Sequence, residues 1–173
     1  MVTEQTRKDV WEEMLDIARL VRYYEKLADR HRTQFYIARG TLVLSALIGT
    51  AVFLSQFKIF PQHIQEIVLI IAGLALALAT AWDIVANNAR KAAVLHAISK
   101  ECSLLEIEWR DLWAEVNNHQ SDDSAVREKN RRLTRRLTKV TVWAGDADVR
   151  ENRKLNEECE SIAYKIMTEK YVT

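Results

Sequence analysis

Apolar side chains recur at alternating spacings of four and three residues along the N-terminal part of the chain. The positions concerned are Val10, Met14, Ile17, Val21, Tyr24, Ala28, His31, Phe35 and Ala38. This spacing places them on one side of an α-helix, the arrangement by which one helix packs along another. The pattern therefore predicts a long helix over about residues 10–38 that needs a partner along its apolar side.

The apolar stripe widens at Gly40 into a segment that is apolar on all sides. Residues 40–57 (GTLVLSALIGTAVFLSQF) contain no charged side chain, and neither does a second run at 67–82 (IVLIIAGLALALATAW). In helical form these runs rise about 27 Å and about 24 Å, close to the thickness of the hydrocarbon core of a bilayer. Because the connection is short, the two helices must run antiparallel. We expect two membrane spans, over about residues 40–57 and 64–86.

The alternative is that both runs form the buried centre of a soluble helical bundle. A helix in a small soluble domain keeps one polar face for water, whereas polar side chains in these runs are sparse: Thr41, Ser45, Thr50, Ser55, Gln56 and Thr80. Two arms that are apolar on all sides would expose a patch larger than the roughly few hundred Å² found on soluble monomers. The pattern therefore favours an integral membrane hairpin.

Basic residues near the ends of the two runs predict the orientation of the hairpin. Seven lie on the side of the long arms, whereas the connecting loop has only Lys58; the seven are Lys26, Arg30, Arg32, Arg39, Arg90, Lys91 and Lys100. Basic residues next to membrane spans collect on the cytoplasmic side. We therefore expect both arms and both termini in the cytoplasm.

A second helical stripe follows the second run. It consists of Leu95, Ile98, Cys102, Leu105, Trp109, Leu112 and Val116. An antiparallel hairpin brings this stripe beside the N-terminal one, so the arms are expected to pair as a coiled-coil stalk. Residues 1–120 are thus predicted to form a hairpin with long cytoplasmic arms.

The last third of the chain predicts a pair of cytoplasmic helices, residues 121–173. The polar cluster NNHQSDDS at 117–124 is typical of a loop, and Ser121 or Asp122 is available to cap the next helix. One helix is expected over about residues 124–143. The segment AGDAD ends it, and another helix follows over about 147–171, with an apolar stripe at Leu155, Cys159, Ile162 and Ile166.

Composition agrees with an all-α fold and narrows the function. Only four residues of 173 are Gly and one is Pro, which favours long helices. The 25 Lys and Arg balance 24 Asp and Glu, so we expect no direct nucleic-acid binding. The two cysteines and four histidines have no metal-ligand spacing, and the chain contains no catalytic motif. We therefore expect neither an enzyme nor a cofactor or metal site.

Polar and small residues within the spans have two interpretations. Thr41, Ser45, Gly49 and Gln56 lie near one helical face, which in an oligomer is suited to line a pore. Alternatively, small residues let helices approach closely, as expected for the Ser45–Gly49 and Gly73–Ala77 pairs. Because neither span contains a charge, a pore is expected to be a non-selective leak.

Arg39 and Asp83 mark the cytoplasmic boundary of the predicted hairpin. Each is about 22 residues from position 61, near which the connection is centred, so the two are expected at one depth. They either pair across the hairpin or extend separately to the lipid headgroups. Trp82 is predicted to anchor the helix at the membrane interface.

The stretch REKNRRLTRRLTK, residues 127–139, contains seven basic residues. If this helix folds back about residue 121, three ion pairs with the preceding arm are expected: Arg127–Glu115, Arg131–Asp111 and Arg135–Glu108. Arg132 and Arg136 are left over, four residues apart on one face, a spacing that suits a phosphate-bearing ligand or an acidic partner. The alternatives are a solvated helix face and contact with anionic lipid.

Three segments of residues 20–120 are distinctive: LIGTAVFLS with its Gly49, Thr50 and Phe53, the Ala- and Leu-rich second run, and NNARKAAVLHAISKECSLLEIEWRDLW after it. In these segments the chain resembles the SLATT family of two-span membrane proteins from bacterial conflict systems. The resemblance implies an effector of anti-phage defence and abortive infection that oligomerises and opens the bacterial inner membrane. The family also implies a trigger, such as a partner enzyme or a nucleotide signal.

The expected function is therefore a pore-forming or membrane-disrupting effector that acts as a homo-oligomer in the bacterial inner membrane. Several copies are needed because one hairpin cannot enclose water. The alternative is a membrane-anchored helical scaffold that docks a partner protein and conducts nothing.

Overall fold

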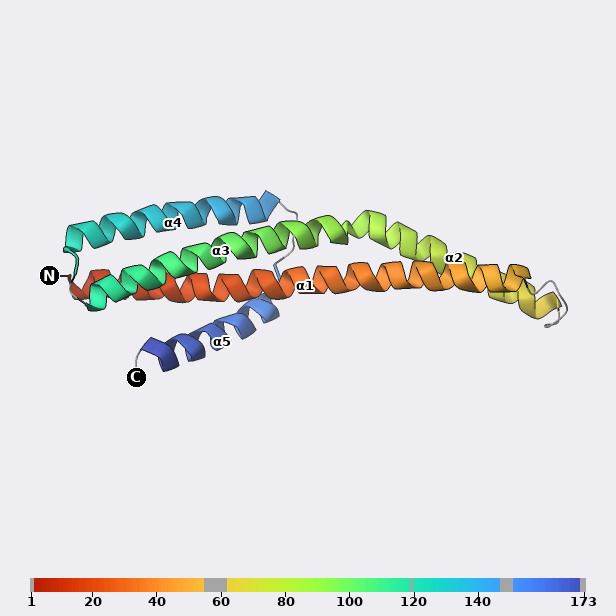
Figure 1. Cartoon of the computed structure of the whole chain (residues 1–173), viewed down its shortest axis with the longest axis horizontal. Helices are drawn as coiled ribbons and strands as arrows, with labels where there is room; N and C mark the ends of the chain where they lie inside the picture. Colours follow the sequence, from red (N-terminus) through yellow and green to blue (C-terminus); the bar gives the residue numbers. More distant parts are fainter. Residues whose placement is uncertain (1, 55–61, 119, 147–150, 172–173) are drawn as a thin grey trace. The chain divides into compact units, whose positions relative to one another are not determined.

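The computed structural model describes residues 2–54, 62–118, 120–146 and 151–171. Side chains at 49–54, 62, 63, 65, 69 and 83–86 lie outside the description. The described residues form the helices α1 (Glu4–Leu54), α2 (Gln62–Ala86), α3 (Asn88–Asn117), α4 (Asp123–Asp146) and α5 (Arg153–Tyr171) (Figure 1). This part of the chain contains no strand, so the prediction of an all-α fold is confirmed for it.

The chain divides into two compact units. The bundle unit comprises residues 1–28 and 93–173, and the hairpin unit comprises residues 29–92. The sequence had suggested a boundary near residue 120, followed by a C-terminal pair of helices packed on the arms. In the structure these two helices belong with the arms, because their apolar faces are buried in the same core.

The core of the bundle unit is the seam between α1 and α3. All seven predicted positions of α3 are buried, each with no more than 3% of its surface exposed: Leu95, Ile98, Cys102, Leu105, Trp109, Leu112 and Val116. On α1, Val10, Met14 and Ile17 are fully buried. Each large side chain removed from water contributes about 1.5–3 kcal/mol, so this seam is the main source of stability in the unit.

Helix α4 lies beside α3 (Figure 1) and contacts α1 through a hydrogen bond from Arg127 to Thr6. The indole Nε1 of Trp109 donates a hydrogen bond of 2.8 Å to the side-chain oxygen of Asn130, and Leu133 and Leu137 are buried nearby on the same face of α4. Asp122 caps α4, since its carboxylate accepts the backbone N–H of Asp123 at 2.9 Å. Of the two capping residues that the sequence offered, the structure uses Asp122.

Helix α5 packs against α1 in the bundle unit. The hydroxyl of Tyr23 accepts the backbone N–H of Asn152 at 2.9 Å, and Lys26 pairs with Glu158 at 2.6 Å. The buried positions of α5 are Leu155, Cys159, Ala163 and Met167. The predicted stripe through Ile162 and Ile166 is therefore wrong in its second half, because α5 presents a row at four-residue spacing, one of the ridges by which helices interlock.

The hairpin unit contains the second half of α1, all of α2 and the first residues of α3. Its buried side chains, among those described, are Ala38, Ser45, Ala72 and Asn88. Helix α2 ends at Ala86, and Asn87 adopts a left-handed conformation with φ 46° before α3 begins at Asn88. No break at this point was predicted from the sequence.

Among the described residues, no helix includes a stretch with both the length and the apolar character needed to cross a membrane. The expected spans over 40–57 and 64–86 include residues 55–57, among them Gln56, which lie outside the described part of the chain.

Candidate functional site

The outer surface of the hairpin unit is covered by large apolar side chains. On α1 these are Ile37, Val43, Leu44, Leu47 and Ile48, and on α2 they are Ile64, Ile67, Ile70, Ile71, Leu74, Leu76, Leu78 and Trp82. Leu78 is 69% exposed, whereas Ala72, one of the few buried residues of the unit, is 8% exposed. Soluble proteins bury their large apolar residues, so this unit has the reverse arrangement.

The polar positions predicted to line a pore have different surroundings in the hairpin. Ser45 is buried, with 8% of its surface exposed. The hydroxyl of Thr41 donates to the carbonyl of Ile37 at 2.9 Å, so its hydrogen bond is made within α1. The side chain of Gly49 and the whole of Gln56 lie outside the described residues. Within one hairpin, Ser45 is therefore a packing residue.

Gly73 and Ala77 do not contact α1, contrary to the packing interpretation for a single hairpin. Both are exposed, and a Cβ built on Gly73 would have no atom within 4 Å. Ala72 is buried in their place. Helical spacing predicts the buried side of a helix only to within about one residue. In α2 the row of side chains that contains Ala72, next to the row of Gly73, faces α1. Gly73 and Ala77 lie instead on the outer surface.

An apolar groove of about 470 Å³ lies between α1 and α2 in the hairpin unit. Its lining residues are Gln34, Ile37, Ala38, Thr41, Ala75, Leu78, Ala79 and Trp82. Because Ala38, Ala75 and Ala79 are small, the two helices leave space between the larger side chains. With only Gln34 and Thr41 as polar groups, the groove has the chemistry to hold a hydrocarbon chain or an apolar side chain.

The predicted membrane boundary is described in part. The guanidinium carbon of Arg39 lies 4.5 Å from the centre of the Phe35 ring, a cation–π contact within α1. Trp82 is 57% exposed. The side chain of Asp83 lies outside the described residues, so the pairing of Arg39 with Asp83 stays a prediction.

A buried polar contact at the α2–α3 junction was missed by the sequence analysis. Nδ1 of His31 lies 2.8 Å from the side-chain oxygen of Asn88, whose residue is 1% exposed. The side-chain amide nitrogen of Asn88 has no partner among the described residues. The signal for this junction was the dipeptide Asn87-Asn88, since asparagine tolerates the left-handed conformation better than most residues.

The basic residues of α4 form ion pairs in a different register from the predicted one. Lys129 pairs with Glu115 at 2.6 Å, and Nη1 of Arg136 lies 2.6 Å from both carboxylate oxygens of Glu108. The predicted pairs Arg127–Glu115 and Arg135–Glu108 are therefore wrong. The turn between α3 and α4 extends to Asp122, which caps α4. Each glutamate of α3 therefore pairs with a basic residue one or two positions further along α4 than predicted.

Arg127 instead joins the start of α4 to the start of α1. It pairs with Asp123 at 2.9 Å, and its Nε donates to the hydroxyl of Thr6 at 2.9 Å. Asp123 in turn accepts the backbone N–H of Thr3 at 2.8 Å. This hydrogen bond lowers the pKa of the Asp123 carboxyl below its ordinary value.

The expected phosphate contact at Arg132 and Arg136 is not formed as an open basic pair. Arg136 is occupied by Glu108, and Arg132 lines a shallow cavity of about 250 Å³ together with Glu108, Asp111 and Glu115. Three carboxylates repel a phosphate group. Arg131 and Asp111 are exposed, and no ion pair joins them in the described part of the chain.

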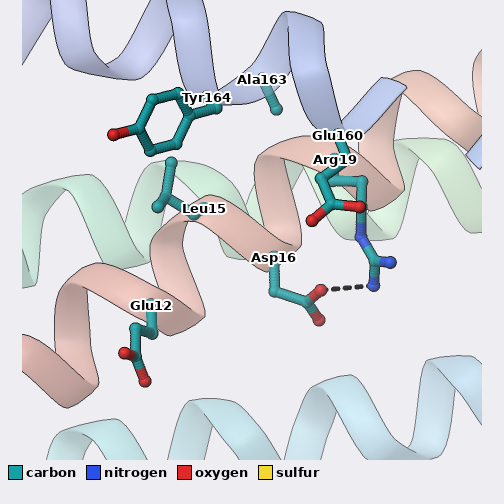
Figure 2. A pocket seen from close by; sticks show the side chains of 7 residues that line it. All are labelled: Glu12, Leu15, Asp16, Arg19, Glu160, Ala163 and Tyr164. Atoms are coloured by element: carbon teal, nitrogen blue, oxygen red, sulfur yellow. Dashed lines mark hydrogen bonds and ion pairs between the residues drawn. The ribbon is translucent and has the colours of Figure 1, made fainter. Parts of the chain in front are cut away.

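A further cavity, of about 200 Å³, lies between α1 and α5 (Figure 2). Glu12, Leu15, Asp16 and Arg19 of α1 face Glu160, Ala163 and Tyr164 of α5. Arg19 is held by an ion pair with Asp16, so its charge is already balanced. The cavity has no histidine or cysteine in its lining.

The two cysteine thiols and the Tyr24 side chain of the bundle unit are buried. Burial raises the pKa of the Cys102 thiol to about 12 and that of Tyr24 to about 12. A thiol with so high a pKa carries little thiolate near neutral pH and is a poor nucleophile. The described residues contain no group of three or more His, Cys, Asp or Glu positioned to hold a metal ion.

Comparisons of the chain with protein-family models, with curated proteins and with solved structures found no match. The functional interpretation therefore depends on the residues themselves. The feature that departs furthest from an ordinary helical protein is the apolar outer surface of the hairpin unit.

Proposed function

We propose that the hairpin unit inserts into the bacterial inner membrane and that several copies together open or disrupt that membrane as effectors of a defence system. The observation that carries the proposal is the arrangement of side chains in the hairpin. Large apolar residues such as Leu47, Ile70 and Leu78 are exposed, while the buried positions are occupied by Ala38, Ser45 and Ala72. Helices in lipid pack through small residues and turn large apolar ones to the acyl chains.

Insertion is favourable because these exposed side chains leave water. Removing a large aliphatic side chain from water contributes about 1.5–3 kcal/mol, and twelve such positions are exposed among the described residues of the two helices. The hydroxyls of Thr41 and Thr80 donate to the carbonyls of Ile37 and Leu76, so neither hydroxyl requires water. Little polar surface opposes the transfer.

The uncharged run of α2 is short for a span, and the residues at its ends offset this. Sixteen residues, 67–82, rise about 24 Å, less than the roughly 30 Å of an average hydrocarbon core. A bilayer thins locally around a short helix at a modest cost. Trp82 is exposed at the end of the run, where an indole suits the headgroup region.

An oligomer is required for conduction, since two helices enclose no aqueous path. No described residue between Gly40 and Ser45 on α1 or between Ile67 and Trp82 on α2 is charged. A pore built from such helices has no strong means of selecting ions. The resemblance to SLATT effectors supports this non-selective leak, released on a signal from a partner enzyme or a nucleotide.

The first test is fractionation of cells that express the chain. We expect the full chain in the inner-membrane fraction, released by detergent and retained through a high-salt or alkaline carbonate wash. Charged contacts with the membrane surface weaken in salt, whereas inserted helices stay. Recovery of the chain in the carbonate supernatant would contradict insertion and remove the proposal.

The second test measures the membrane potential of induced cells with a fluorescent dye. We expect depolarisation by the unaltered chain and its loss in Ser45→Leu, because Leu overpacks the buried position and typically costs about 1–3 kcal/mol of hairpin packing. Val43→Leu, which also enlarges a side chain of α1 but at a position 60% exposed, is the matched control, and it should depolarise like the unaltered chain. A membrane-inserted protein that leaves the potential unchanged would contradict the pore.

A second candidate function is a membrane-anchored scaffold that conducts nothing. The observation in its favour is a set of exposed cations on α4, Arg131, Arg132, Arg135 and Lys139, for which the described residues supply no ion pair. An acidic partner protein would complement this face. Insertion without leakage, combined with partner binding that is lost in Arg131→Glu and Arg135→Glu, would favour the scaffold.

A further inference from the structure

Helix α3 has an exposed apolar face that no element of the bundle unit covers. Leu104 is 45% exposed and Ile107 is 53% exposed, although the neighbouring Leu105 and Trp109 are completely buried or nearly so. The same outward face carries Ala93, Ala97 and Ala114, with Lys100 before the two apolar residues and Asp111 after them. Leu104 and Ile107 are three residues apart, so their side chains lie next to each other and form a small apolar strip on this face.

The charges on this face are arranged symmetrically about its apolar centre. Lys100 lies four residues before Leu104, and Asp111 lies four residues after Ile107. Ala97 and Ala114 are three residues further out at either end. Because of this symmetry, the cation Lys100 at one end of the face corresponds to the anion Asp111 at the other end. The aliphatic side chains of Leu104 and Ile107 lie between them.

We propose that this face binds the same face of a second copy, with the two α3 helices antiparallel. A twofold axis between residues 105 and 106 places Leu104 against Ile107 of the second copy and Lys100 against its Asp111. Each contact then occurs twice, as in any twofold-symmetric interface. Neither Lys100 nor Asp111 has an ion pair within the described residues, so both charges are available to the second copy.

The charges also select the orientation of the two helices. In a parallel pair in register, Lys100 would face Lys100 and Asp111 would face Asp111, and like charges at such positions are unfavourable. The antiparallel pair brings one like-charged contact, between Glu101 and Glu108 of the second copy. Arg136 already holds both oxygens of Glu108 at 2.6 Å, so this repulsion is largely offset within each copy.

The contact is small because each copy contributes one helix face. Interfaces that bury less than about 1,200 Å² belong to weak or transient complexes. The dimer is therefore expected to dissociate in the micromolar range and to depend on protein concentration. Alanines at 93, 97 and 114 allow the helix backbones to approach along the contact, which compensates in part for its size.

This inference does not depend on the proposed membrane activity. Each α3 continues at Asn88 into its own hairpin unit through Asn87, so antiparallel pairing connects the two hairpins to opposite ends of the contact. A dimer of this kind differs from a set of copies inserted side by side in one bilayer. Failure of membrane insertion would leave the dimer untouched, and failure of the dimer would leave the leak untouched.

Zero-length cross-linking tests the geometry directly. The full chain, extracted in mild detergent, is treated with a carbodiimide, which joins an amine to a carboxylate in contact with it. Lys100 and Asp111 are separated by about 16 Å along one helix, so a Lys100–Asp111 link forms only between copies. We expect this peptide by mass spectrometry from an isotopically mixed sample. A link from Lys100 to another carboxylate of the second copy, without the Asp111 link, would overturn the proposed pairing.

Charge reversal measures the energy of the contact. By sedimentation in detergent, Lys100→Glu and Asp111→Lys should each raise the dimer dissociation constant about tenfold, because every reversal changes two symmetry-related pairs. The double variant Lys100→Glu with Asp111→Lys should restore it to within about threefold. Lys139→Glu on α4 is the matched control and should have no effect. A chain that stays monomeric throughout, or a double variant weaker than either single one, would overturn the dimer.

Discussion

The two units of this chain share the helix α1 yet bury opposite kinds of side chain. In the bundle unit, the buried positions include Met14, Ile17 and Trp109, and nearly all described charged residues lie outside; Glu106, which is 8% exposed and pairs with Arg110, is buried. In the hairpin unit, Ala38 and Ala72 are buried, while Leu78 and Ile70 are 69% and 62% exposed. The bundle unit buries its large apolar side chains, whereas the hairpin unit exposes them, which is the arrangement that the proposed insertion into lipid would require.

The largest expected effect tests this contrast through side-chain truncation. Trp109→Ala should lower the free energy of unfolding of the bundle unit by about 3–5 kcal/mol, because it removes a fully buried indole and its hydrogen bond to Asn130. Leu78→Ala, at an exposed position of the hairpin, should change it by less than about 0.5 kcal/mol. Urea denaturation of each full-length variant in detergent, followed by tryptophan fluorescence and helical circular dichroism, measures both. Equal losses would mean that Leu78 is covered by protein.

The next effect tests the contrast by adding a charge to each unit. Leu74→Arg places a guanidinium on the outer face of α2, and Arg at the centre of a span costs about 2.5–3.5 kcal/mol on insertion. We expect the membrane partition constant, measured in a flotation assay, to fall by about two orders of magnitude. Tyr164→Arg, at a position 60% exposed on α5, is the control for added charge. A loss in both variants would indicate a general effect of charge rather than contact of Leu74 with lipid.

Acidification should affect the bundle unit through its α3–α4 turn. Hydrogen bonds from Thr3 and others lower the pKa of Asp123 from 3.8, and those from Lys129 and Ser121 lower the pKa of Glu115 from 4.5. A carboxyl whose pKa is lower in the folded chain stabilises the fold above its unfolded pKa, and this contribution is lost as pH falls through the folded value. The loss therefore begins below about pH 4.5 and continues toward lower pH.

The control for this pH effect is Asp123→Asn, which removes the titrating carboxyl. The variant should be less stable than the unaltered chain at pH 7 and should lose less stability between pH 5 and pH 3. Denaturation midpoints at pH 7, 5, 4 and 3 give the comparison. Parallel curves for the two proteins would show that Asp123 does not contribute to the pH dependence.

The sequence predicted the seams better than it predicted the contacts between them. All seven positions of the α3 seam were correct, because a long apolar stripe fixes which side of a helix is buried. The register of α4 was wrong by one or two residues, since it depends on where the turn ends, and Asp122 extends it. Likewise, Met167 rather than Ile166 is buried on α5. The way α5 packs against its neighbours determines which of two adjacent rows of side chains is buried, and the apolar pattern does not report this.

The α2–α3 junction shows a different limit of the sequence. Asn87 and Asn88 lie in an otherwise continuous helical pattern, and helical periodicity does not report a single residue with φ 46°. The contact of Asn88 with His31 joins positions 57 apart in the chain, which local spacing cannot indicate. On the hairpin surface, the pattern indicated that both runs are apolar on all sides, but the predicted packing pair Gly73–Ala77 missed Ala72, the neighbouring residue that is buried.

The smallest expected effect concerns Gly73, which is exposed beside the buried Ala72 on α2. A Cβ at Gly73 would have no atom within 4 Å, so Gly73→Ala adds a methyl group without a clash and removes the flexibility of glycine from a helix interior. Replacement of Gly by Ala in such a site stabilises a helix by about 0.5–1 kcal/mol, and a rise of a few degrees in the melting temperature of the detergent-solubilised chain is expected. Ala72→Leu is the contrasting variant, because Ala72 is 8% exposed and a larger side chain would push α2 from α1. If Gly73→Ala destabilises the chain and reduces its oligomerisation, Gly73 contacts another copy, and the outer face of α2 is part of the assembly rather than of the lipid boundary.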